Sequence, residues 1–145
     1  MKAKVIIDSE ESIQLAVDAS VQISSRAGFS SLDTTLIASS VSESCSNVVK
    51  YADKGELSIS YDEFFKSIEV ICTDEGPGIK NINKYKLDGK TTSNSSLGIG
   101  LGAIQRAMNS LVIETVLGVG TRLKMSKWKP FINDFIEYGI SQKTP

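Results

Sequence analysis

The chain contains no histidine among its 145 residues. It therefore has no Ser-His-Asp triad, no histidine-bound metal and no histidine that could be autophosphorylated. Its net charge of −1 gives no electrostatic basis for binding nucleic acid or an anionic membrane. No apolar run is long enough to span a bilayer, and we expect no signal peptide, so the sequence predicts a cytoplasmic protein.

Cysteine is scarce, with only Cys45 and Cys72 present, and both lie in apolar stretches without metal-ligand spacing. We interpret them as reduced thiols of the core. A hydrophobic content of 41% and a charged content of 23% are ordinary for a soluble globular protein. The length predicts a single domain with a sizeable core.

Apolar periodicity and turn residues predict the secondary structure along the chain. The expected elements are a strand at 4–7, helices at 9–27 and 32–52, strands at 56–61 and 67–73, a helix at 103–110, strands at 112–116 and 121–127, and a last helix from Pro130. Asp8 and Glu11 have the spacing of a capping box for the first helix, which Gly28 ends. Ser30 or Ser31 caps the second helix.

The stretch from Val70 to Ile79 is the one around which the chain is organised. Its first half has the apolar pattern of a buried strand, and the second half, which begins at Asp74, is a sharp turn rich in glycine and proline. A carboxylate beside bare backbone suits a flat ring with an amino group, because Asp74 can accept a hydrogen bond from that group. Taken alone, these residues are also typical of a β-turn with a solvated Asp. The choice between a binding turn and an ordinary turn therefore depends on the rest of the chain.

The helix at 32–52 carries two stripes of side chains. One is an ordinary core stripe, formed by Ile37, Val41, Cys45 and Val48. The other is apolar at its start and then polar, and it contains Glu43 and Asn47, which are four residues apart and project from one face. That face fits the wall of a pocket, and a solvated flank is the alternative that helical periodicity leaves open.

Polar residues without periodicity occupy 80–96, and loops of this length in a compact domain are often lids or binding loops. A merely mobile loop is the alternative. Glycines then alternate at Gly98, Gly100 and Gly102, just before the helix expected at 103–110. Their backbone N–H groups and the helix dipole suit the binding of phosphate. The spacing matches neither a dinucleotide-binding fingerprint nor a Walker loop.

Four short motifs occur in order along the chain: Glu43-x-x-x-Asn47, Asp74-x-Gly76-x-Gly78, Leu97-Gly98-Ile99-Gly100-Leu101 and Gly120-Thr121. They resemble the N, G1, G2 and G3 boxes of the GHKL (Bergerat-fold) ATPases. The short lid, the sequence Asp-Glu-Gly-Pro-Gly-Ile and the closing Lys127-Trp128 resemble those of the RsbT-like serine/threonine switch kinases of bacterial stress signalling. These kinases are relatives of the SpoIIAB and RsbW anti-sigma kinases.

The resemblance covers about residues 3–128 of the chain. It implies the Bergerat ATP-binding fold, a two-layer α/β sandwich in which a mixed, mostly antiparallel sheet is covered on one face by helices. We therefore expect an ATPase or kinase domain at 1–128 and a C-terminal helical extension at 129–145.

The resemblance also implies a role for each site residue. Asp74 would accept a hydrogen bond from the adenine amino group, with Thr121 in support through water. Asn47 would hold Mg²⁺ against the phosphates of ATP, and Glu43 would act as the base or orient the attacking hydroxyl. The other cofactor-binding residues would be Gly76, Gly78, Ile79, Gly98, Gly100, Leu101 and Gly102.

Two positions depart from the family pattern. Ser96 stands where a glycine commonly opens the G2 box, and Ser46 stands where RsbT-like kinases often carry a basic residue. Lys50, one turn after Asn47, and Lys90 in the lid are the candidates to supply the missing charge.

The resulting hypothesis is an ATP-dependent protein serine/threonine kinase that phosphorylates a STAS-domain antagonist or scaffold protein. A PP2C-type phosphatase or a sigma factor would be a further partner, and a homodimer is allowed. One alternative is an ATP-binding anti-sigma or partner-switching module with little or no kinase activity. Another is an isolated ATPase domain like that of histidine kinases, which the absence of a phospho-accepting histidine disfavours.

Overall fold

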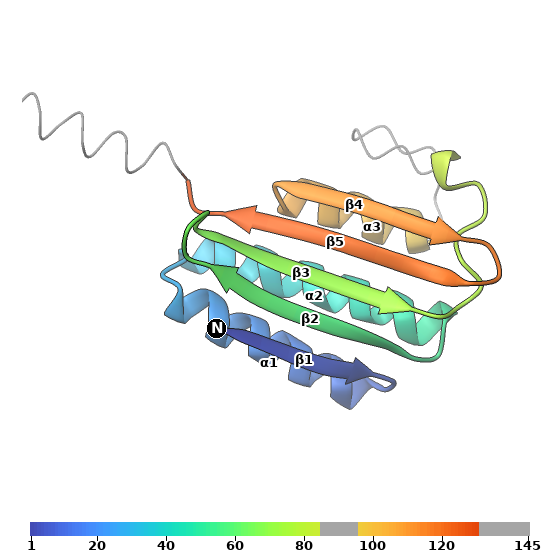
Figure 1. Ribbon diagram of the computed structural model, residues 1–145, viewed down its shortest axis with the longest axis horizontal. Coiled ribbons are helices and arrows are strands. Elements are labelled where there is room, and N and C mark those ends of the chain that lie inside the picture. The colour runs from blue at the N-terminus through green and yellow to red at the C-terminus, as the bar shows by residue number, and fades with distance from the viewer. Residues whose placement is uncertain (85–95, 131–145) are drawn as a thin grey trace, which may run out of the picture.

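Alternating apolar and polar side chains build a sheet with the strand order β1-β2-β3-β5-β4 (Figure 1). The structure is a computed structural model and describes residues 1–84 and 96–130. Its strands are β1 Lys2–Ile7, β2 Gly55–Asp62, β3 Ser67–Asp74, β4 Ser110–Val116 and β5 Gly120–Trp128. The first strand, β1, lies at one edge of the sheet.

All neighbouring strands described here pair antiparallel. Short hairpins join β2 to β3 and β4 to β5, which only antiparallel neighbours allow. Between β1 and β2 the chain runs out along one helix and back along the next, so β2 begins where β1 ends, with Ile7 opposite Gly55. The mostly antiparallel sheet is thus confirmed, but the parallel pair of a mixed sheet is not found among the described strands.

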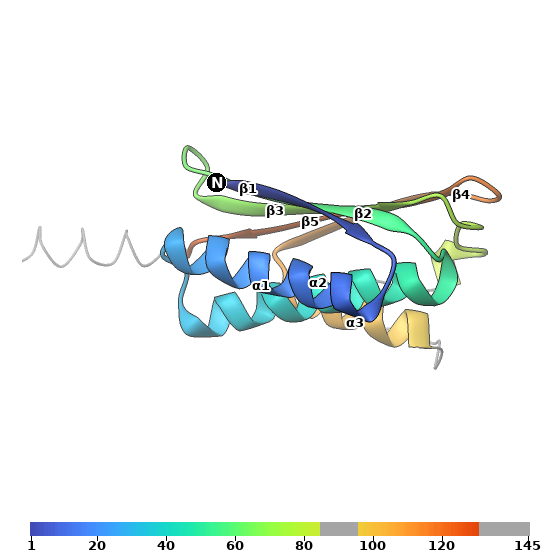
Figure 2. The same cartoon turned by 90° about the horizontal axis from the view of Figure 1, so that it is seen from below.

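Three α-helices lie on one face of the sheet (Figure 2). They are α1 Glu10–Arg26, α2 Ser31–Tyr51 and α3 Ser96–Ala107, and a short 3-10 helix, η1 Ile82–Lys84, precedes the undescribed part of the lid. The two-layer sandwich that the sequence predicts is therefore confirmed. The expected helix after Pro130 and most of the predicted lid lie outside the described residues.

The helix caps agree only partly with the prediction. Ser9, not Asp8, is the N-cap of α1, and Ser12, not Glu11, completes the capping box. The two serines form the box because each short side chain reaches the backbone of the other. Ser9 Oγ accepts from the Ser12 N–H at 3.2 Å, and Ser12 Oγ accepts from the Ser9 N–H at 3.0 Å. Ser30 caps α2 through the backbone N–H of Asp33.

The core lies between the sheet and the helices. The predicted stripe of α2 is fully or almost fully buried, and it packs with Leu57 and Ile59 of β2 and Val70 of β3. Burying this apolar surface is the main stabilising contribution to the fold.

The opposite face of the sheet carries charged side chains beside the exposed apolar Ile6, Val112 and Val116. Ion pairs between neighbouring strands join Lys4 to Glu56, Lys124 to Glu69 and Arg122 to Glu114. The side chains of these ion pairs are exposed on that face. Among the described helices, none is long and apolar enough to cross a membrane.

Candidate functional site

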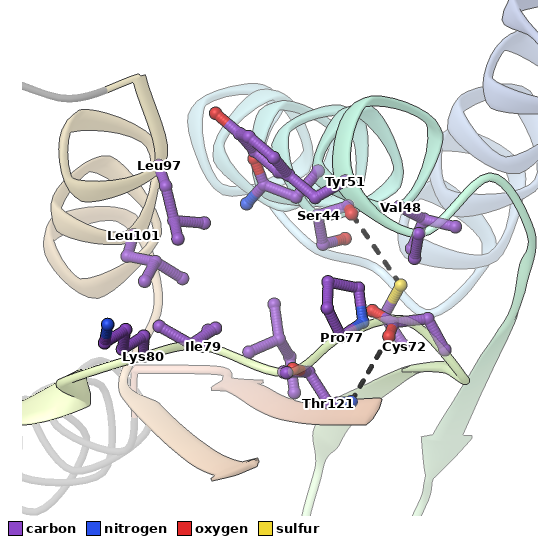
Figure 3. Close-up of a pocket in the computed structure, with 15 residues that line it drawn as sticks. Ser44, Val48, Tyr51, Cys72, Pro77, Ile79, Lys80, Leu97, Leu101 and Thr121 are labelled. Atoms are coloured by element: carbon purple, nitrogen blue, oxygen red, sulfur yellow. Dashed lines mark hydrogen bonds between the residues drawn. The ribbon is translucent and has the colours of Figure 1, made fainter. Parts of the chain in front are cut away.

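One cavity opens between α2, α3 and the ends of β3 and β5 (Figure 3). Its floor is the turn that follows β3, as the sequence predicts, because Asp74 is the last residue of that strand. The sequence-predicted residues that line the cavity are Asn47, Asp74, Gly78, Ile79, Leu101 and Thr121. The structure thus brings together residues from all four motifs, with Leu97 and Leu101 from the third.

Two backbone groups orient the Asp74 carboxylate. The N–H of Gly76 donates to Asp74 Oδ1 at 2.9 Å, and the N–H of Thr121 donates to the same oxygen at 3.2 Å. Within the described chain, Oδ2 therefore remains as the acceptor for a ligand in the cavity. An oriented acceptor beside a glycine turn is the arrangement expected for an amino-bearing ring.

Close approach of neighbouring backbone explains two of the glycines. Gly78 has φ +76°, and a Cβ there would lie 2.6 Å from the backbone oxygen of Val116. Gly120 has φ +150°, and its Cβ would collide with the backbone oxygen of Asp74. The β4–β5 hairpin can therefore pack directly against the turn that carries Asp74, which brings Thr121 into the cavity.

The α2 wall of the cavity contains Asn47 and Tyr51, one turn apart on the same face. Asn47 Nδ2 is buried, and no residue in the described chain hydrogen-bonds to it. A buried amide without a partner is costly unless a ligand satisfies it. From Asn47 to Tyr51 this face is therefore a pocket wall, not the solvated flank that periodicity left open.

Glu43 lies outside the lining of the cavity, where α2 meets α3. A Cβ on Gly100 would be 2.7 Å from Glu43 Oε2 and 4.0 Å from Asn47 Nδ2. Gly100 thus leaves room for the half-buried Glu43 carboxylate next to the Asn47 amide. The predicted shared face of Glu43 and Asn47 is confirmed, and it points toward α3.

The prediction for the start of α3 was wrong. The helix begins at Ser96 instead of 103 and ends at Ala107, so Gly98, Gly100 and Gly102 are helical and do not form a preceding loop. Leu97, Leu101 and Ile104 recur at helical spacing, and burial of the last two outweighs the poor helix propensity of glycine. Of the three glycines, Gly98 lies in the first turn of α3, and Gly100 and Gly102 lie further along the helix.

Among the described residues that line the cavity, Lys80 is the basic one, and the sequence analysis did not select it. Figure 3 shows it on the same side as Leu97 and Leu101 of α3. Lys50 is exposed and is not among the lining residues, because it lies off the face shared by Asn47 and Tyr51. Lys90 lies outside the described residues.

Several further lining residues were missed by the sequence analysis: Ser44, Val48, Tyr51, Ala52, Cys72, Pro77, Leu97 and Leu123. A signal existed for Ser44 and Tyr51, because they extend the face of Asn47 at helical spacing. Gly76 is not a lining residue, and its part is to donate its N–H to Asp74.

The two cysteines meet at the edge of this cavity. Cys72 lines it and donates a weak hydrogen bond to the Ser44 backbone oxygen, with a sulfur–oxygen distance of 3.8 Å (Figure 3). Hydrogen bonding to Cys72 and then burial raise the pKa of the Cys45 thiol well above its usual range. Cys45 therefore stays protonated, and the interpretation of both residues as free, buried thiols is confirmed.

Comparison with known proteins gives the family of the chain. Residues 8–127 match the model of the histidine kinase-like ATPase domain. The chain belongs to this family. Membership implies the use of ATP, which agrees with a largely apolar cavity between α2 and the sheet that presents the Asp74 carboxylate.

Two curated relatives of the family are protein kinases by name. Serine/threonine-protein kinase RsbT of Bacillus subtilis is 37% identical over 103 residues, which cover 70% of this chain and 77% of RsbT. Serine-protein kinase RsbW of Bacillus velezensis is 28% identical over 107 residues, covering 67% of each protein. The chain is thus similar to both over two thirds or more of its length.

The fold is shared more widely. A chain of the SiaB–SiaC complex from Pseudomonas aeruginosa superposes with a TM-score of 0.62 at 12% identity, covering 87% of this chain and 88% of that one. At this identity the likeness concerns the fold alone. It agrees with the antiparallel sheet and helix layer described above.

Proposed function

We propose that this chain is an ATP-dependent protein serine/threonine kinase of the RsbT type. One observation carries the proposal: Asp74 and Thr121 line the same cavity as Asn47, and Glu43 lies one turn before Asn47 on the same helix. An acceptor for a base and a carboxylate beside a buried amide are the parts that phosphoryl transfer needs, since its catalysis is mainly positioning and charge neutralisation. The 37% identity to RsbT supports the choice of reaction.

Mg²⁺ is the metal that this site would hold with ATP. Mg²⁺ usually takes one or two protein ligands and completes its shell with phosphate oxygens and water. The buried Asn47 amide without a partner fits such a ligand, because rotation of the amide exchanges its nitrogen and oxygen. Among the described residues, no three Asp, Glu or Cys side chains cluster into a metal cage, which agrees with a metal that depends on the nucleotide.

Glu43 is the catalytic residue of this proposal. It would accept the proton of the incoming serine or threonine hydroxyl, or orient that hydroxyl for attack on the terminal phosphate. Asn47, on the cavity wall, would then bind the metal, and Glu43, which faces α3, would transfer the proton. The phosphates would lie near Gly98, in the first turn of α3. The Lys80 ammonium would supply positive charge for them.

The substrate that we propose is a STAS-domain antagonist or scaffold protein in a bacterial partner-switching pathway in the cytoplasm. A PP2C-type phosphatase or a sigma factor would act in the same pathway, and the kinase would work alone or as a homodimer. Residues 1–128 would form the kinase domain, and 129–145 a C-terminal helical extension. The resemblance of the four motifs supports this assignment.

The test is incubation of the full chain with radiolabelled ATP, Mg²⁺ and a STAS-domain protein encoded beside it in the genome. We expect label on a serine or threonine of that protein. Nucleotide-dependent binding of the partner without label would favour the alternative, an anti-sigma or switching module that has lost catalysis at Ser46 and Ser96. No binding of ATP at all would contradict both.

A further inference from the structure

Thr115 belongs to none of the four sequence motifs, yet its side chain holds two parts of the site together. It is the penultimate residue of β4 and pairs with Thr121 of β5 across the hairpin. Its Oγ1 accepts a hydrogen bond from the Ile79 backbone N–H at 2.8 Å and lies 3.0 Å from Thr121 Oγ1. The Gly120 backbone oxygen, at 3.4 Å, is the other acceptor within hydrogen-bond distance of the Thr115 O–H.

The direction in which the Thr115 hydroxyl donates its single proton determines whether Thr121 can act as a hydrogen-bond donor in the cavity. A hydroxyl has one proton and two lone pairs, and the Ile79 N–H already occupies one lone pair of Thr115. The Gly120 oxygen lies beyond the usual range for an O–H···O hydrogen bond, whereas Thr121 Oγ1 lies at its limit. If Thr115 donates to Thr121, the proton of Thr121 is left to point into the cavity.

We propose that Thr115 is a positioning residue that makes Thr121 a hydrogen-bond donor and thereby selects adenine over guanine. This inference rests on the proposed ATP site. Asp74 Oδ2 is an acceptor only, so the cavity would present an acceptor from Asp74 and a donor from Thr121. Adenine carries an amino donor beside the N1 acceptor. Guanine carries the O6 acceptor beside the N1–H donor and mismatches both groups.

Thr115 also fixes the wall on which the base would rest. Its bond to Ile79 acts together with the bond from the Gly118 N–H to the Pro77 oxygen, at 2.8 Å. Both link the turn after β3 to the β4–β5 hairpin. A purely structural Thr115 would therefore affect every nucleotide alike, whereas an orienting Thr115 would affect adenine nucleotides most.

The experiment measures Mg²⁺-ATP and Mg²⁺-GTP binding by calorimetry for the full chain and three variants. Thr115→Val keeps the shape of the side chain and removes the hydroxyl, while Thr115→Ser retains it. Thr73→Val is the matched control, because Thr73 is an exposed strand threonine that does not line this cavity. Thermal unfolding of each variant reports whether the fold is retained.

We expect wild type to prefer ATP, and Thr115→Val to lose about three- to tenfold in ATP affinity with little change for GTP. Thr115→Ser and Thr73→Val should keep the wild-type preference. Equal losses for both nucleotides, an unchanged preference in Thr115→Val, or no preference in wild type would overturn the inference while leaving the ATP site in place. If wild type bound neither nucleotide, the proposed function itself would fail, and this inference with it.

Discussion

The Asp74 carboxylate accepts a hydrogen bond at 3.2 Å from the backbone N–H of Thr121, although the two residues are 47 positions apart. The same oxygen accepts from the Gly76 N–H at 2.9 Å. Two strands are thereby joined at the floor of the cavity, and the second carboxylate oxygen keeps one orientation. A preorganised acceptor loses little freedom when a ligand binds, which favours affinity.

Asp74→Asn tests this acceptor directly. The amide oxygen can still accept from Gly76 and Thr121, so the turn should persist, but the group facing the ligand becomes an NH₂ donor opposite the adenine amino group. We expect ATP affinity to fall by roughly ten- to a hundredfold, since a hydrogen bond to a charged group contributes about 1.5–3 kcal/mol. Calorimetry giving the same affinity for both proteins would remove Asp74 from the site.

The turn that carries Asp74 could be predicted from the sequence because its causes are local. An apolar strand that meets glycine and proline must turn there, and the carboxylate at the junction is placed by the chain itself. The core stripe of α2 is equally local, because helical spacing alone puts Ile37, Val41 and Cys45 on one side. Both predictions are confirmed.

The start of α3 and the basic residue of the cavity depended on packing across the chain. Three glycines lower helix propensity by about 1 kcal/mol each relative to alanine, so a loop was expected before residue 103. Burial of Leu101 and Ile104 against the sheet and α2 extends the helix back to Ser96. Helical spacing sets Lys50 off the face of Asn47 and Tyr51, but Lys80 follows the turn in a segment without periodicity, so no local pattern marks it as facing the cavity.

Gly100→Ala should separate helix stability from catalysis. Alanine at this position gains about 1 kcal/mol of helix propensity, but its Cβ would lie 2.7 Å from Glu43 Oε2 and would force that carboxylate to move. We expect a melting temperature at or above that of wild type, together with clearly slower phosphate transfer.

Gly102→Ala is the matched control for that substitution. Its Cβ would meet only the flexible end of Arg106, at 3.2 Å, so transfer should stay near the wild-type rate. Circular dichroism melts and a radiolabel transfer assay on both variants provide the comparison. Equal transfer rates for the two variants would mean that the position of Glu43 does not matter.

Lys80→Gln should lower the affinity for ATP more than the affinity for adenosine. Lys80 lines the cavity on the α3 side but is exposed, so its attraction for phosphate is screened by solvent. We expect a loss of about two- to fivefold for ATP, smaller at high salt, and no change for adenosine. Lys50→Gln is the control, and an equal effect there would show that net charge, not position, is responsible.

Lys127→Met should destabilise the fold at the end of α3. The Lys127 Nζ donates to the Ala107 backbone oxygen at 2.6 Å and lies 3.8 Å from an Asp33 carboxylate oxygen, and both side chains are less than one-fifth exposed, at 13% and 17%. Methionine keeps the packing but leaves both partners unsatisfied. We expect the free energy of unfolding to fall by about 1–3 kcal/mol in urea titrations.

Lys54→Met, at an exposed position, serves as the reference and should change stability by less than about 0.5 kcal/mol. If Lys127→Met were as stable as Lys54→Met, the contacts of Lys127 would contribute nothing net. Nucleotide affinity should be unchanged in both variants, because neither lysine lines the cavity.

Glu43 and Asn47 lie one turn apart on α2, and their proposed tasks can be separated by mutation. Asn47→Ala removes the buried amide proposed as a metal ligand, so it should impair both Mg²⁺-ATP binding and transfer. Glu43→Gln keeps the size and hydrogen-bonding shape of the side chain but cannot accept the proton. Because Glu43 lies beside Gly100 and not on the cavity wall, ATP affinity should change little.

Transfer by Glu43→Gln should slow by about 10²–10⁴-fold, the usual contribution of a positioned base. Calorimetry with Mg²⁺-ATP and single-turnover transfer to the STAS-domain partner measure the two effects separately. A loss of transfer with intact binding assigns the chemistry to Glu43 and the kinase activity to this chain. Transfer at the wild-type rate in Glu43→Gln would exclude Glu43 as the base and leave only a positioning role for the Glu43–Gly100 contact.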